Sequence, residues 1–158
     1  MNTDSIASEV LIEAPIERVW AALTEPASVS AWFCNGREIS IDLRIGGVMI
    51  LDHGDHGRYP TVIVSVVPPN AFSFRWAVLD PGALATEENS TLVEFTLKTT
   101  PEGTVLRVLE SGFDNLAVPA GRSMSSLFED HSGGWPQVVN ELAQYVMANV
   151  GTPRVDPS

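Results

Sequence analysis

The chain has 158 residues, of which 44% are hydrophobic and 18% charged, and its formal net charge at pH 7 is -11. This length and composition predict one globular domain with a substantial buried core, and they exclude a disordered chain. Because so negative a surface repels phosphate backbones and anionic lipids, we expect neither nucleic acid nor membrane among the partners.

The two ends of the chain carry few structural signals. The N-terminal sequence MNTDSIASEV has neither a basic start nor an apolar run, so no secretory signal is visible.

A single cysteine, Cys34, excludes an internal disulfide and fits a reducing compartment. We therefore expect a cytoplasmic protein whose one domain, residues 1–158, has a core at about 7–150 and loose tails at 1–6 and 151–158.

The first elements are a strand and two short helices. A strand is predicted at residues 8–14, and Pro15 suits the first position of a helix. Apolar residues at helical spacing in IERVWAALT predict a helix over 16–24. Pro26 ends that helix, and ASVSAWF predicts a second short helix over 27–33.

A series of strands follows. Isoleucine and leucine alternate with polar residues throughout 39–45, which predicts a half-buried strand. Further strands are predicted at 48–53, 61–67, 72–78, 91–99 and 104–111. Short turns rich in glycine, proline and asparagine connect them, so the strands form an antiparallel meander and the fold class is α+β.

An amphipathic helix closes the chain. Its apolar stripe recurs at steps of three and four residues: Trp135, Val138, Val139, Leu142 and Val146. This is the helix long enough to cover the sheet, and a large twisted sheet curls as it grows. A helix laid across a curled sheet leaves a gap beneath its middle, which either large side chains fill or a mostly apolar pocket occupies.

Several motifs, in one order along nearly the whole chain, resemble the START-like superfamily, which includes polyketide cyclases and pathogenesis-related plant proteins. The similar branch is the one named for the activator of the heat-shock chaperone ATPase. The motifs are IEAPIERVWAALTEPASVSAWF at 12–33, DLRIGG at 42–47, VVPPNAFSFRW at 66–76, GTVLRVLESGF at 103–113 and Gly134-Trp135. The resemblance implies a helix-grip fold, in which a curved antiparallel sheet of about six or seven strands packs on a long C-terminal helix around a cavity.

The start of that last helix has two interpretations. The resemblance implies a start near Ser123, so that Gly133 and Gly134 lie within the helix and let its backbone approach the sheet or a ligand. Pro136 would then bend the helix, because proline lacks the amide hydrogen for the turn before it. Alternatively, a loop ends at Gly134 and Pro136 lies in the first turn of a new helix.

We expect the cavity to bind a small apolar molecule without a metal or other cofactor. The expected lining residues are Trp32, Phe33, Leu51, His53, Arg58, Phe74, Trp76, Glu110, Phe113, Trp135 and Val139. Arg58 or Glu110 would orient the ligand through a polar contact. The family branch implies a second hypothesis, a stress-associated module that binds a chaperone or another protein, and we expect a monomer or a homodimer.

Glu110 is the candidate for chemistry. It shares a strand face with Leu106 and Val108, so an inward face would place a carboxylate in an apolar cavity. There it could be a general acid in a cyclase-like or hydrolase-like enzyme, or a hydrogen-bond anchor. The interpretation we favour is that Glu110 lies at the strand end, near solvent or paired with an arginine.

Two other groups are weaker candidates. The run Asp52-His53-Gly54-Asp55-His56 contains residue types that bind divalent ions, but it falls at a predicted hairpin tip, where neighbouring side chains diverge. A solvated turn is the interpretation we favour. Cys34 has no histidine close in sequence that would activate it as a nucleophile, so we expect a half-buried thiol.

Overall fold

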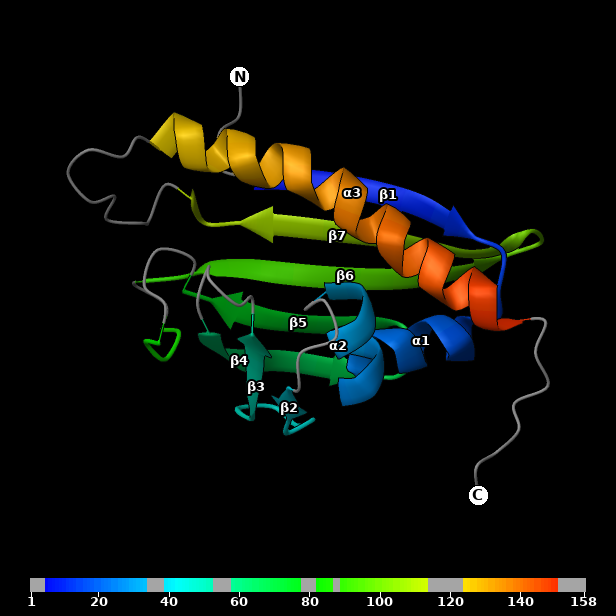
Figure 1. The fold of residues 1–158 in the computed structure, drawn as a ribbon, viewed down its shortest axis with the longest axis horizontal. Coiled ribbons are helices and arrows are strands. Elements are labelled where there is room, and N and C mark those ends of the chain that lie inside the picture. Colours follow the sequence, from blue (N-terminus) through cyan, green and yellow to red (C-terminus); the bar gives the residue numbers. More distant parts are fainter. Residues whose placement is uncertain are drawn as a thin grey trace.

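A single antiparallel sheet with three helices on one face makes up the fold of this computed structural model (Figure 1). The structure describes residues 5–33, 39–52, 58–77, 82–86, 89–113 and 124–150. The strands are β1 (Ser5–Ile12), β2 (Ser40–Ile41), β3 (Val48–Asp52), β4 (Arg58–Val67), β5 (Ala71–Trp76), β6 (Thr91–Thr100) and β7 (Gly103–Ser111). The helices are α1 (Ile16–Thr24), α2 (Pro26–Phe33) and α3 (Met124–Val150). The predicted α+β helix-grip fold is confirmed.

The strand order explains how the sheet carries a buried face. The order is β1-β7-β6-β5-β4-β3-β2, and every neighbouring pair is antiparallel. From β2 to β7 the strands follow the chain as a meander, and β1 adds at the far edge beside β7. Register places Glu110 of β7 between Ile6 of β1 and Val93 of β6. Because side chains alternate along a strand, these three residues point to the same face.

The inner face of the sheet is strongly apolar and lies under the helices (Figure 1). Phe72 and Phe74 of β5 are buried there, as are Val93 and Phe95 of β6. The intervening Glu94 points to the opposite, outer face. The alternation of apolar and polar residues in the sequences of β5 and β6 therefore predicts correctly that these four apolar side chains lie in the core.

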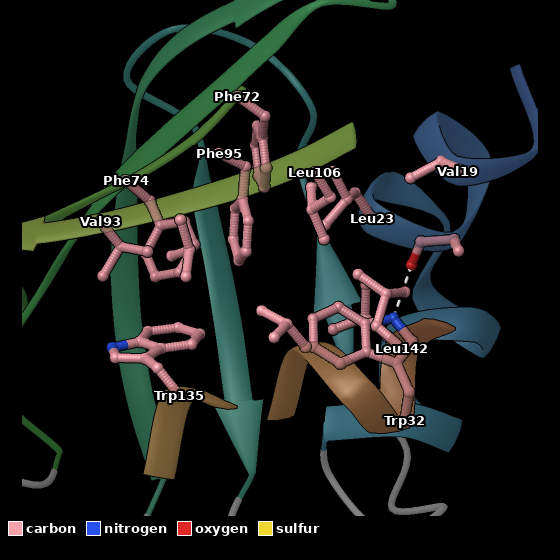
Figure 2. Packing of buried hydrophobic residues seen from close by; sticks show 14 of the residues in the cluster. Val19, Leu23, Trp32, Phe72, Phe74, Val93, Phe95, Leu106, Trp135 and Leu142 are labelled. Atoms are coloured by element: carbon pink, nitrogen blue, oxygen red, sulfur yellow. Dashed lines mark hydrogen bonds between the residues drawn. The ribbon is translucent and has the colours of Figure 1, made fainter. Parts of the chain in front are cut away.

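Specific hydrogen bonds join the two short helices to each other and to α3. Val19 and Leu23 form the buried stripe of α1. From α2, the indole Nε1 of Trp32 donates a hydrogen bond of 2.7 Å to the carbonyl oxygen of Ala22 (Figure 2). The hydroxyls of Ser28 on α2 and Tyr145 on α3 are hydrogen-bonded at 3.0 Å. These contacts fix α2 between α1 and α3.

The long helix crosses the sheet obliquely and contacts β1, β7, α1 and α2 (Figure 1). It begins at Met124, before the two glycines, and includes Pro136. The structure therefore supports the first of the two interpretations of its start. At Gly134, close approach to the sheet does not explain the glycine, since a methyl group added there would meet nothing within 4 Å.

The strand predicted over 39–45 is also shorter than expected. Only Ser40–Ile41 is a strand, and Leu43 and Ile45 are 41% and 70% exposed rather than buried. The chain turns at this point: the amide of Gly46, at φ +81°, donates to the carbonyl of Ile63 at 2.8 Å. A hydrogen bond from Arg44 N to Asp42 O, also 2.8 Å, tightens the turn. Alternation in the sequence cannot show that tertiary hydrogen bonds end a strand early.

Candidate ligand site

Five aromatic side chains meet where α2 and α3 face strands β4, β5 and β6. This aromatic cluster consists of Phe33, Tyr59, Trp76, Phe95 and Trp135. Trp135 is central, with its ring centroid 6.0 Å from Phe33, 6.5 Å from Trp76 and 5.9 Å from Phe95. Figure 2 shows the ring of Phe95 pointing from the sheet toward the α3 side, where Trp135 lies.

The cluster is built mainly from edge-to-face contacts. The planes of Trp76 and Trp135 meet at 80°, and those of Phe95 and Trp135 at 82°. Tyr59 meets Trp76 at a centroid distance of 5.8 Å and an angle of 86°. Each such pair contributes about 0.5–1.5 kcal/mol beyond the area that it buries. The rings therefore hold one another in fixed and differing orientations.

Exposure is uneven within the cluster. Phe95 and Trp135 are buried, whereas Phe33 and Trp76 are half-buried. Trp32 stacks on Phe33 with a centroid distance of 5.0 Å and an interplanar angle of 13°. Phe33 and Trp76 are thus the partly exposed rings of the cluster.

Glu110 connects the cluster to the sheet. Its side chain is 0% exposed, and it lies on the inner face rather than near solvent. Thr91 Oγ1 donates a hydrogen bond of 2.6 Å to Glu110 Oε2, and Trp135 Nε1 donates one of 2.8 Å to Glu110 Oε1. Burying a carboxylate is costly unless hydrogen bonds stabilise it. These two donors make Glu110 a fixed bridge between β6, β7 and α3.

Most of the residues expected to line a cavity lie in the core under the helices. Trp32, Phe74, Phe113 and Val139 are buried, as is Leu51, which faces Tyr59 across β3 and β4. Arg58 lies at the start of β4, with its side chain 63% exposed and its Nε 3.8 Å from Asp52 Oδ2. His53 and Cys34 lie outside the described residues.

Thr91 is the site residue that the sequence reasoning missed. It begins β6 and pairs with Trp76 of β5, so it faces inward beside Glu110. The sequence contained a partial signal, since Thr91 shares its strand face with Val93 and Phe95. A threonine on an apolar face needs a buried acceptor.

Neither a metal-binding cluster nor a membrane-crossing helix is present among the described residues. Within the described ranges, no three His, Cys, Asp or Glu side chains are grouped so that they could hold a metal ion. Four residues of the Asp52–His56 run, from His53 onward, lie outside those ranges. None of the helices in the described part of the chain has the length and apolarity needed to cross a membrane.

Comparison with known proteins gives one family match. The sequence model of the family described as "Activator of Hsp90 ATPase homolog 1-like protein" matches residues 13–147. No curated protein matches the chain.

Three solved structures illustrate the similarity in fold. Protein MLL2253 from Mesorhizobium loti is 26% identical with a TM-score of 0.71, and the match covers 91% of this chain and 97% of that one. DynU16, from the dynemicin biosynthetic locus, is 28% identical with a TM-score of 0.72 over 93% of this chain, which spans 48% of DynU16. The Aha1 dimer from Colwellia psychrerythraea has a TM-score of 0.70 at 18% identity, with 90% and 95% of the two chains covered, and shows the fold alone.

Proposed function

Since this chain belongs to the family of Activator of Hsp90 ATPase homolog 1-like proteins, whose helix-grip fold supports ligand binding, we propose that it binds a small apolar molecule at the aromatic cluster. The observation that carries the proposal is the clustering of the half-buried rings of Phe33 and Trp76 around the buried ring of Trp135. Apolar sites with a few convergent polar groups are the usual form of a small-molecule site.

The binding free energy would come mainly from burial. A ligand that removes about 200 Å² of apolar surface from water gains on the order of 5 kcal/mol before the entropy cost of association. Ring contacts with Trp76 and Phe33 would add to this value. Arg58 lies at the exposed start of β4, which favours Glu110 over Arg58 as the polar group of the site.

A paired substitution tests the site. The ligand is sought by native mass spectrometry of the purified protein, and binding is measured with an uncharged naphthalene dye. Trp76→Leu should lower dye affinity at least about tenfold, since it removes one accessible ring face. Trp20 of α1 is the matched control. It is also half-buried, but its ring packs on that of Phe72, with the two centroids 6.4 Å apart. Equal affinities for Trp76→Leu and Trp20→Leu would contradict the proposal.

Catalysis by Glu110 has less support. Both of its oxygens already accept hydrogen bonds, from Thr91 and Trp135, and these contacts fix the carboxylate in place. A general acid must instead present a proton to the substrate. The arrangement favours the role of a hydrogen-bond anchor.

A protein-interaction role is the second candidate, because the family description refers to activation of the Hsp90 ATPase. The turn at 42–47 offers a surface for it: Ile45 is 70% exposed, and Arg44 Nε lies 2.8 Å from Asp42 Oδ2. Isolated exposed side chains are common, so the turn alone does not identify a partner. Purified Hsp90 would decide the question, since Ile45→Ser should abolish any stimulation of its ATPase if this turn is the contact.

A further inference from the structure

The sheet has a second face, the outer face, which lies opposite the three helices and the aromatic cluster (Figure 1). On β1, β7, β6 and β5, which lie side by side in this order, most side chains of the outer face are exposed or half-buried. We propose that two copies of this chain associate through this part of the outer face to form a homodimer. The proposal does not depend on the ligand site, which lies on the inner face.

The first argument is the apolar surface of the outer face. Leu11 of β1 is 44% exposed and lies directly opposite the half-buried Val105 of β7. Leu109 of β7 lies opposite Glu94 of β6, and Leu92 is two residues from Glu94, so both leucines point to the same face. Both are half-buried. A second copy packed on this face would remove the four apolar side chains from water.

The second argument is the size of the face. The strands β1, β7, β6 and β5 contain 8, 9, 10 and 6 residues. With about 4.8 Å between strands and about 3.3 Å per residue, they present roughly 500 Å² in projection. Two such faces give a total of roughly 1,000 Å², which is near the lower limit for a specific interface. We therefore expect a weak dimer, with a dissociation constant of about 1–100 µM.

The third argument is the distribution of charge. Glu9 of β1 lies opposite Arg107 of β7, and Glu94 and Lys98 of β6 share the outer face with Arg75 of β5. These five groups make this part of the face net positive, although the formal net charge of the chain is -11. Two copies therefore repel each other least where these faces meet. Because acids and bases are interspersed, each face also carries charges complementary to the other, as a two-fold interface requires.

Sedimentation velocity at 0.15 M salt measures the association of the natural chain, and two reversed-charge variants test the face. Glu9→Lys with Glu94→Lys makes the face strongly basic, and Lys98→Glu with Arg107→Glu makes it strongly acidic. Each double variant alone should have a dissociation constant at least about tenfold higher than the natural chain, since like charges then meet. An equimolar mixture of the two should associate again, because a basic face then meets an acidic one.

Two changes away from the face are the controls. Glu141→Lys lies on α3, on the other side of the sheet, and Arg44→Glu lies in the turn at 42–47; both residues are exposed. Each should keep the dissociation constant within about twofold, because salt screens distant charges. A natural chain that stays monomeric up to about 1 mM, a mixture that stays monomeric, or an equal loss in the controls would overturn the inference.

Circular dichroism checks that every variant is folded. If a double variant does not fold, the single changes Glu9→Lys and Arg107→Glu replace it, since both positions are exposed and lie directly opposite each other. Each single variant should also weaken association, and their mixture should restore it. Unchanged association in both single variants would be equally adverse.

Discussion

Replacing Thr91 with valine should destabilise the fold more than the same replacement at Thr61 or Thr104. All three threonines are 0% exposed, and each donates a hydrogen bond from its hydroxyl. Thr61 donates to the carbonyl oxygen of Met49 at 2.6 Å, and Thr104 to that of Ala14 at 2.8 Å. Thr91 differs because its acceptor is the carboxylate of Glu110, at 2.6 Å.

The expected magnitudes follow from the acceptor. A hydrogen bond to a neutral group contributes about 0.5–1.5 kcal/mol to the free energy of unfolding, and one to a charged group about 1.5–3 kcal/mol. Valine resembles threonine in shape, so little cavity forms at any of the three positions. Thr91→Val should therefore cost about 2–3 kcal/mol, compared with about 1 kcal/mol for Thr61→Val and Thr104→Val.

Urea denaturation followed by circular dichroism measures the three values, provided that the slope with denaturant stays constant. A second measurement isolates the charge: in a Glu110→Gln background, Thr91→Val should cost about as much as the other two substitutions. Three equal losses in the natural background would refute the argument that Thr91 stabilises a buried carboxylate.

Other substitutions test the helices and the turn. Gly134→Ala should stabilise the fold by about 0.5–1 kcal/mol and raise the thermal midpoint, since alanine favours a helix and its methyl group meets nothing within 4 Å. Gly47→Ala should lower the free energy of unfolding by about 1–3 kcal/mol, and with it the thermal midpoint, because the added Cβ would collide with a backbone carbonyl oxygen in the same turn. Trp32→Phe removes the donor to the carbonyl of Ala22 and should cost about 1–3 kcal/mol in urea denaturation. Ile45→Ser should change stability by less than about 0.5 kcal/mol, as 70% of that residue is exposed, and a large loss in a thermal melt would contradict the turn geometry.

Periodicity predicted the sheet well where each strand has one buried face. In β5 the residues Phe72, Phe74 and Trp76 alternate with polar residues, and Phe72 and Phe74 are buried on the inner face. The same signal failed in 39–45, where the chain leaves the strand after Ile41. Alternation identifies the faces of a strand, but the backbone bonds of Gly46 and Gly47 with Ile63 decide where this strand ends.

The candidate site was less accessible from sequence than the fold. The face that Glu110 shares with Leu106 and Val108 made an inward direction one possible interpretation, but its place near the strand end favoured the other, which is wrong because Glu110 is 0% exposed. Its two donors could not be predicted, since Thr91 and Trp135 are 19 and 25 residues away from it along the chain. That pairing depends on the register of β6 against β7 and on where α3 crosses the sheet, and tertiary packing sets both.

The breakers beside Trp135 weaken the segment of α3 that carries the cluster. Glycine costs about 1 kcal/mol in a helix interior relative to alanine, and proline about 3 kcal/mol. Gly134 has open space around its α-carbon, so steric need does not explain it, and Pro136 removes an amide donor. Helix propensity therefore opposes order at this point, whereas the hydrogen bond to Glu110 and the contacts with Phe33, Trp76 and Phe95 favour it. The position of Trp135 thus depends more on its tertiary partners than on the helix.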